Sequence, residues 1–101
     1  MRVRWTRTAI GHLASIYEYI AQDSARYAKR TVDRITVRSE QIALFPRSGQ
    51  VVSEYVDSDI REVVEGSYRV IYRVTQAEVE ILAVIHGARL LPPAPPADVA
   101  G

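Results

Sequence analysis

The 101-residue sequence contains no cysteine and only one residue each of tryptophan, phenylalanine and methionine. The absence of cysteine excludes disulfide bonds and thiolate–zinc sites, and it is in keeping with a cytoplasmic protein. No apolar run approaches the roughly 20 residues needed to span a bilayer. Polar side chains also interrupt the basic N-terminal segment. We therefore expect neither a membrane span nor a signal peptide.

Histidine and glycine are scarce and scattered, which limits the chemistry that the chain can carry. His12 and His86 lie on different predicted elements without metal-ligand spacing, and the five glycines stand singly rather than in a phosphate-binding loop. Nothing favours a serine-based triad. A paired-carboxylate hydrolase would draw on glutamates that flank turns or face outward, where carboxylates are ordinarily solvated. Those glutamates are Glu62, Glu65, Glu78 and Glu80. We expect no metal and no cofactor.

Two neighbouring segments organise the chain. Residues 68–75 and 78–86 alternate with period two and are rich in β-branched and aromatic side chains, and a short polar break between them predicts a hairpin. Both faces of the second segment are largely apolar, which predicts a strand inside the sheet. Strict alternation would collect four polar side chains on one face of this hairpin: Arg69, Arg73, Glu80 and His86.

Helical spacing dominates the N-terminal half. After a short expected strand at residues 2–5, apolar side chains recur every three or four positions in residues 8–22 and 25–44. Residues 60–65 form a further expected strand, and residues 51–56 should be extended and loosely held. The order β-α-α-β-β-β predicts a two-layer α+β domain, with a helical hairpin packed on one face of a mainly antiparallel sheet. We expect the other face to be open and to be the working face.

Charge is divided unevenly along the chain. Residues 1–50 hold nine Lys/Arg against four Asp/Glu, whereas residues 51–101 hold four against eight. Within the second predicted helix, arginines recur at a strict spacing of four: Arg26, Arg30, Arg34 and Arg38, with Lys29 alongside. One interpretation is a solvated face on which Asp33 offsets part of the positive charge, and the other is a docking surface for an acidic partner. The asymmetry is too mild to argue for nucleic acid alone.

The C-terminal end differs in composition from the rest. Four of the five prolines fall in residues 91–101. Proline has no backbone N–H for a strand ladder, so this segment is expected to be a proline-rich, disordered tail. The folded domain is expected to cover residues 1–90.

Basic side chains of the predicted sheet are the remaining candidates for function: Arg61, Arg69, Arg73, His86 and Arg89. Arginines near a histidine could hold a phosphodiester while the histidine exchanges a proton, as RNA cleavage requires. The alternative is that Arg69 and Arg73 form cross-strand ion pairs with glutamates such as Glu62, Glu65 and Glu80. Both interpretations remain open at this level.

Several short motifs recur in a fixed order: Trp5-x-x-x-Ala9, Phe45-Pro46-x-x-Gly49, Ile60-Arg61-Glu62, Tyr68-Arg69-x-x-Tyr72-Arg73 and Ile81-x-x-x-x-His86-x-x-Arg89. In this order and spacing, residues 3 to about 90 resemble the RelE/ParE superfamily of toxins from bacterial type II toxin–antitoxin systems. The resemblance implies a cytoplasmic protein that a cognate antitoxin neutralises in a toxin–antitoxin hetero-oligomer. The segment of the antitoxin that wraps the toxin is typically disordered when free.

The superfamily has two branches that differ in target. RelE-like members resemble ribosome-dependent mRNA endoribonucleases, and ParE-like members inhibit DNA gyrase without nuclease chemistry. This chain has Val64 where RelE-like nucleases usually have a basic residue, and Leu90 and Leu91 where they carry a tyrosine or similar group. We therefore favour the ParE-like branch, with the RelE-like branch as the alternative. A toxin fold that serves only as a binding module or co-repressor is a third possibility.

Both branches give roles to the same side chains. If the chain is a nuclease, the catalytic candidates are His86, Arg89 and Arg61. If it acts by binding, the surface for the target or the antitoxin comprises Arg61, Arg69, Arg73, His86 and Arg89.

Overall fold

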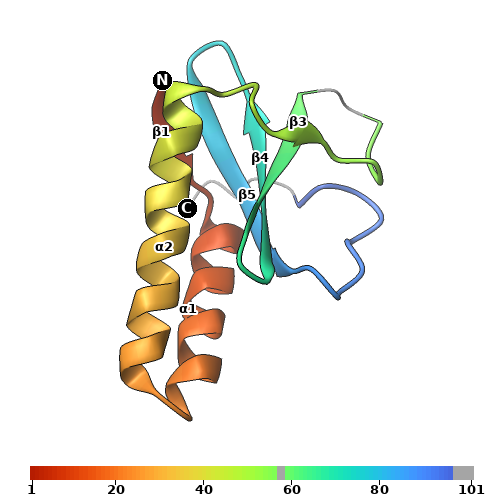
Figure 1. Ribbon diagram of the computed structural model, residues 1–101. Coiled ribbons are helices and arrows are strands. Elements are labelled where there is room, and N and C mark those ends of the chain that lie inside the picture. The colour runs from red at the N-terminus through yellow and green to blue at the C-terminus, as the bar shows by residue number, and fades with distance from the viewer. Residues whose placement is uncertain (57–58, 97–101) are drawn as a thin grey trace.

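A computed structural model shows a pair of helices packed against a five-stranded sheet (Figure 1), and it describes residues 1–56 and 59–96. The elements, in chain order, are β1 (Arg2–Trp5), α1 (Arg7–Ala21), α2 (Ala25–Leu44), β2 (Gln50–Val51), β3 (Ile60–Glu65), β4 (Tyr68–Val74) and β5 (Glu78–His86). Both predicted helices are confirmed to within a residue at each end. The predicted two-layer α+β architecture is confirmed as well.

The strands follow the spatial order β1-β5-β4-β3-β2. β1 runs parallel to β5, and the other neighbours are antiparallel. β5 therefore lies inside the sheet, as its two apolar faces predicted. The hairpin between β3 and β4 turns at Gly66, whose φ of +59° is the left-handed conformation that a two-residue turn requires.

Side-chain caps fix where both helices begin. The Thr6 hydroxyl accepts a hydrogen bond from the Ala9 N–H at 3.2 Å, and it donates to the Ile81 carbonyl at 2.7 Å, which ties the start of α1 to β5. The Ser24 hydroxyl accepts from the Tyr27 N–H at 3.1 Å and starts α2. These caps satisfy N–H groups that have no partner within the helix. α2 ends where Pro46 excludes a helical conformation for the residue before it.

The main hydrophobic core lies between the helices and the sheet. It joins three helical side chains to seven from the strands: Ala9, Ile35 and Ile42 with Val63, Val70, Tyr72, Val74, Val79, Ile81 and Val84. We call the side of the sheet that bears this core the helix face. The opposite side is called the second face.

A β-bulge in β5 changes which side chains share a face. Ile71 pairs with Ala83 and the next residue, Tyr72, pairs with Ile81, so Leu82 has no partner across the ladder. One extra residue shifts the alternation that follows it. His86 consequently lies on the helix face, where its ring meets Tyr68 edge-on at 5.5 Å between centroids. The prediction that His86 shares a face with Arg69 and Arg73 is wrong for this reason.

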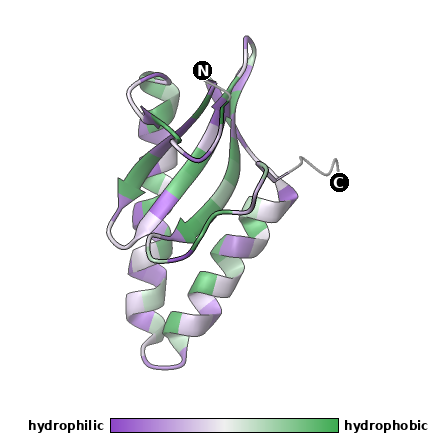
Figure 2. Ribbon diagram, turned by 90° about the vertical axis from the view of Figure 1, so that its right-hand side faces the viewer, coloured by the Kyte–Doolittle hydropathy of each residue, from purple (hydrophilic) through white to green (hydrophobic). Residues whose placement is uncertain are grey.

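The second face is covered by irregular chain, so the prediction of an open face is wrong. Its apolar cluster comprises Val52, Tyr55, Ile60, Ile71, Leu82 and Ala83, with Ile85 and Leu91 packed against it. Figure 2 looks onto this face of the sheet, with the helices behind. Only Gln50 and Val51 of the segment before β3 form a strand. Val52 is fully buried, so residues 51–56 are held more closely than predicted.

Within the described part of the chain, no helix is long and apolar enough to cross a membrane.

Candidate functional site

Arg69 is held on the second face by two carboxylates. Its Nε and Nη2 donate to the two carboxylate oxygens of Glu62, at 2.9 and 2.5 Å, and its Nη1 donates to Glu54 at 3.0 Å. Hydrogen bonds from Arg69 lower the pKa of Glu54 to about 2, and the same contacts raise the pKa of Arg69. Only 15% of the Arg69 side chain is exposed. The cross-strand interpretation is thus confirmed for this arginine.

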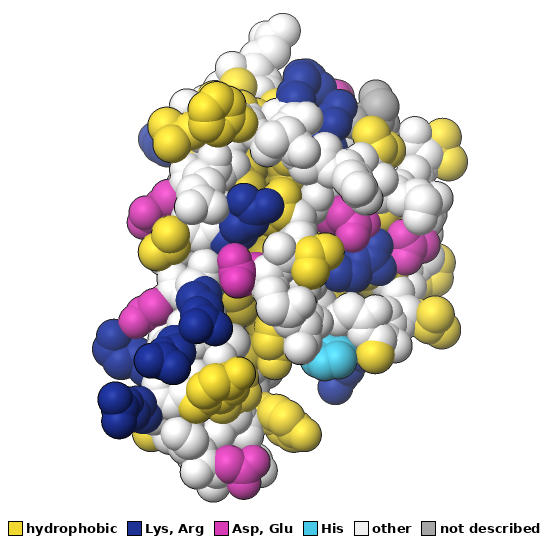
Figure 3. All heavy atoms as spheres, viewed as in Figure 1, with side chains coloured by type: hydrophobic (Ala, Val, Ile, Leu, Met, Phe, Trp, Pro, Cys, Tyr) yellow, Lys and Arg dark blue, Asp and Glu magenta, His cyan; other side chains and the backbone are white. Residues whose placement is uncertain are grey.

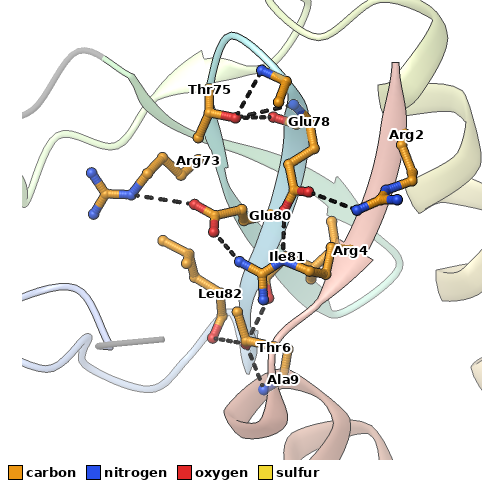
Figure 4. Close-up of polar contacts among 11 residues, drawn as sticks. Arg2, Arg4, Thr6, Ala9, Arg73, Thr75, Glu78, Glu80, Ile81 and Leu82 are labelled. Atoms are coloured by element: carbon orange, nitrogen blue, oxygen red, sulfur yellow. Dashed lines mark hydrogen bonds and ion pairs between the residues drawn. The ribbon is translucent and has the colours of Figure 1, made fainter. Parts of the chain in front are cut away.

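A second set of ion pairs follows the β1 edge of the same face (Figure 4). Arg4 contacts both Glu78 and Glu80, Arg2 donates to Glu78 at 3.2 Å, and the Arg73 Nε lies 4.0 Å from Glu80. Hydrogen bonds from Arg4 and then from Arg2 lower the pKa of Glu78. The lowered pKa favours the charged carboxylate at Glu78, and Glu80 lies between Arg4 and Arg73.

Arg61 lies on the other side of the sheet, where it fastens the chain that follows α2. Its Nη1 donates to the carbonyls of Gly49 and Arg47, at 2.8 and 3.2 Å. Its Nε is buried and has no hydrogen-bond partner among the described residues. Arg61 therefore holds the backbone at Arg47 and Gly49, and its Nε–H can still donate to a further acceptor.

Tyr72 holds the same segment after α2. Its hydroxyl donates to the Pro46 carbonyl at 2.7 Å and accepts from the Gly49 N–H at 3.1 Å. Burial raises the pKa of Tyr72. A Cβ at position 49 would collide with the Tyr72 hydroxyl and lie 2.6 Å from the Glu62 carbonyl oxygen, so glycine is required there. We call Pro46, Gly49, Arg61 and Tyr72 the clamp. All four residues belong to the sequence motifs described above, but no pattern in the sequence indicates that they contact one another.

His86 and Arg89 stand at the end of β5, and both are exposed. The His86 Nδ1 accepts a hydrogen bond from the Ala88 N–H at 3.1 Å, and the Arg89 N–H donates to the His86 carbonyl at 3.0 Å. A tight turn therefore brings these two side chains to the same corner of the molecule.

The five predicted site residues are divided among separate locations. Arg69 and Arg73 lie on the second face, and Arg61 and His86 lie on the helix face. On β4, Arg61 is paired with Tyr72 and His86 is paired with Tyr68. Arg61 and His86 are therefore about four residues, or roughly 13 Å, apart along the strands. Among the residues that the structure describes, no three His, Cys, Asp or Glu side chains gather as metal ligands.

His12 has a contact that its sequence context did not reveal. The His12 Nδ1 accepts a hydrogen bond from the Val84 N–H at 3.1 Å, next to the bulge in β5. Desolvation by burial lowers the pKa of this imidazole. The contact joins residues 72 positions apart, so no local pattern could have indicated it.

A family model for the ParE toxin of type II toxin–antitoxin systems, parDE, matches residues 3–91. The chain belongs to the ParE toxin family. The matched residues include the whole clamp and end at Leu91, which packs on the second face. The chain is thus a type II toxin of the RelE/ParE superfamily, as its motifs indicated.

Known proteins agree with this assignment. The chain is 32% identical to "Toxin RelE2" of Caulobacter vibrioides over 90 residues, which cover 88% of this chain and 98% of that protein. The fold is similar to that of a chain of the chromosomal ParDE system from P. aeruginosa, with a TM-score of 0.71, 21% identity and coverage of 85% and 95% of the two chains. The RelBE2 toxin–antitoxin complex of Mycobacterium tuberculosis gives a TM-score of 0.62, 22% identity and coverage of 84% and 95%.

Proposed function

We propose that this ParE-family toxin acts by binding, as a cytoplasmic inhibitor of DNA gyrase that a cognate antitoxin neutralises. The observation that carries this proposal is the dispersal of the groups a nuclease would need. Arg61 belongs to the clamp, and Arg69 is held between Glu62 and Glu54. His86 lies about 13 Å along the strands from Arg61. General acid–base catalysis needs its groups within hydrogen-bond reach of one reacting atom.

Two further positions support a binding role. Val64 replaces the basic residue that RelE-like nucleases usually carry near the end of β3, and its side chain is 61% exposed. After β5, the Leu90 and Leu91 pair and the prolines that follow offer no proton donor where such nucleases carry a tyrosine or similar group. A site without these groups would forfeit roughly 10²–10⁴-fold in rate for each missing acid or base.

The antitoxin partner is inferred from the family and from the two solved relatives. Both of those proteins are described as toxin–antitoxin systems or complexes. A disordered antitoxin segment that orders on binding can bury a large surface in spite of the ordering cost.

A RelE-like ribonuclease is the second candidate, and two observations favour it. The curated relative carries the name "Toxin RelE2". His86 and Arg89 are also exposed at one corner, as a proton-transfer group and a phosphate-binding cation would have to be.

Two assays with purified toxin separate these candidates. We expect inhibition of gyrase supercoiling with accumulation of cleaved DNA, and intact mRNA on programmed ribosomes. His86→Ala and Arg89→Ala should weaken the inhibition only by weakening binding to gyrase, with Arg7→Ala as the matched control. Arg61→Ala should weaken it too, but this change also removes the hydrogen bonds to the Arg47 and Gly49 carbonyls, so its folding is checked by urea denaturation. Cleavage of A-site codons with unaffected gyrase would instead identify a ribonuclease, with His86 and Arg89 as its catalytic pair.

A further inference from the structure

Three large apolar side chains are exposed together at one end of the molecule. Met1, Leu44 and Phe45 are each more than half exposed, and all three line a groove of about 870 Å³ between the end of α2 and the β4–β5 turn. The Met1 ammonium donates to the Ala43 carbonyl at 3.1 Å, which holds this residue against the end of α2. Figure 3 shows hydrophobic side chains gathered at the upper end of α2. We call Met1, Leu44 and Phe45 the end patch.

The clamp fixes the backbone that carries the end patch. The Phe45 N–H donates back into α2, and the Phe45 carbonyl accepts from the Ser48 N–H at 3.0 Å. The next carbonyl, of Pro46, accepts the Tyr72 hydroxyl at 2.7 Å. Because this backbone is held on both sides, the side chains of Leu44 and Phe45 are presented to solvent on a rigid support. A surface that is rigid before it binds loses little conformational freedom when it is covered.

The rest of the groove is polar or of mixed charge. Ser48, Thr75 and Gln76 offer neutral hydrogen-bonding groups, and the charged side chains in the lining are Arg47 and Asp59. An apolar centre with a polar rim is the layout of a protein–protein interface. Large apolar side chains that are exposed together also indicate an interaction surface and not isolated surface residues.

The two charges at the rim make the end patch complementary to itself. The Arg47 Nη1 lies 3.6 Å from the Asp59 Oδ1, and both side chains are more than half exposed. A two-fold axis through the patch would place Arg47 of one copy beside Asp59 of the other, and would repeat the contact in the opposite sense. The same axis would pack the apolar side chains of the two copies against each other.

The groove along α2 has no such complementarity. It has a volume of about 450 Å³, and its lining includes five basic side chains against two carboxylates. A second copy laid on it would bring like charges together, and like charges across an interface repel. Of these two grooves, the one at the end patch is therefore the one that a second copy of the chain fits.

We propose that the end patch is a homodimer interface, in which two copies of this toxin pack Leu44 and Phe45 together across a two-fold axis. Arg47 of each copy pairs with Asp59 of the other copy. Ten residues line the groove in each copy, fewer than the roughly 20–30 that each side contributes to a standard interface. The dimer should accordingly be weak, with a Kd of about 10 µM. The proposal goes beyond the proposed function, because it holds whether the target is gyrase or mRNA.

Adding a charge at the centre of the patch tests the proposal. Sedimentation equilibrium of purified toxin without an N-terminal tag, from about 1 to 200 µM, should show monomer and dimer exchanging with the expected Kd. Leu44→Lys should raise Kd at least about 30-fold, because it places two ammonium groups near the axis. A lysine is also favourable at the C-terminal end of a helix, so the fold should be retained, and urea denaturation checks this. Val37→Lys is the matched control, since Val37 is also more than half exposed on α2 but lies outside this groove, and it should change Kd less than about 3-fold.

Exchanging the rim charges between copies identifies the contact itself. Arg47→Asp and Asp59→Arg should each raise Kd at least about 10-fold when the variant is alone, because equal charges then face each other. In an equimolar mixture, the copy with two acidic groups meets the copy with two basic groups, so both contacts between copies are restored. The mixture should dimerise within about 3-fold of the wild-type Kd. Neither variant regains its own Arg47–Asp59 pair in the mixture, so only a contact between copies can produce this rescue.

Four results would overturn the proposal. The first is a wild-type toxin that stays monomeric throughout this range, and the second is a dimer that Leu44→Lys affects no more than Val37→Lys does. The third is a mixture of Arg47→Asp and Asp59→Arg that dimerises no more tightly than either variant alone. The fourth is a monomeric wild type in which Leu44→Lys weakens antitoxin binding or gyrase inhibition, since another protein would then cover the end patch.

Discussion

The two faces of the sheet are covered by different kinds of structure. Two capped helices cover the helix face and supply Ala9, Ile35 and Ile42 to its core. The second face is covered by chain without regular structure, from which Val52, Tyr55 and Leu91 reach the sheet. Burial is complete at the centre of both clusters, since Val70 on one face and Val52 on the other are fully buried.

Equal burial on the two faces need not mean equal rigidity. Helices hold their side chains through backbone hydrogen bonds that continue from turn to turn, and the α1–α2 pair is joined by only three residues. The segment before β3 is held mainly by single contacts, such as the Val52 N–H donating to the Ile60 carbonyl at 3.2 Å. We therefore expect the second face to yield locally where the helix face cannot.

The largest effect should come from removing a valine on the helix face. Val70→Ala should lower the free energy of unfolding by about 2–3 kcal/mol, because strands and helices on every side prevent the cavity from closing. Val52→Ala, the matched change on the second face, should cost about 1 kcal/mol, because residues 51–56 can settle into the space. Urea denaturation measures both. Equal losses would show that the irregular cover is as rigid as the helical layer.

A smaller effect should follow from releasing the clamp, which joins the end of α2 to the sheet. Tyr72→Phe leaves the Pro46 carbonyl and the Gly49 N–H without their hydroxyl partner in a buried site, which should cost about 2 kcal/mol. Tyr19→Phe is the control, since Tyr19 is 72% exposed and should change stability by less than about 0.5 kcal/mol. If the two variants unfold at the same urea concentration, the clamp does not contribute to stability.

Sequence predicted the helix face well because its signals are local. Helical spacing, caps and alternation fix the elements without reference to distant residues. The bulge at Leu82 contains no glycine or proline that would indicate it in the sequence, and it moves His86 to the helix face. Contacts on the second face join residues far apart, as when Glu54 meets Arg69 or Tyr55 meets Pro92. Such pairings depend on the folded path of the chain, so composition and periodicity could not reveal which candidate cations were already held in structural contacts.

Lowering the pH should destabilise the protein through protonation of His12. The loss in the free energy of unfolding should be smaller than that expected for Tyr72→Phe. The folded protein holds this imidazole neutral, because Nδ1 accepts the Val84 N–H and burial lowers its pKa below 6.5. The unfolded chain binds the proton more readily. The contribution is therefore present above about pH 6.5 and is lost as pH falls through the lower pKa of the folded state. His12→Asn retains an acceptor near Nδ1 but does not titrate, so its stability should fall less than that of the wild type between pH 7 and 5. Equal slopes in urea denaturation would contradict this.

The smallest effect should come from cutting the tail on the second face. Truncation after Leu91 keeps the leucine that packs on the apolar cluster and removes Pro92, whose carbonyl accepts the Tyr55 hydroxyl at 3.0 Å. A single hydrogen bond at a partly exposed position should contribute at most about 1 kcal/mol. Tyr55→Phe in the full chain removes the same bond and should cost the same. Because both changes act on one contact, the truncated Tyr55→Phe variant should be no less stable than either change alone. Additive losses in urea denaturation would show that the residues after Leu91 stabilise the domain through contacts other than this hydrogen bond.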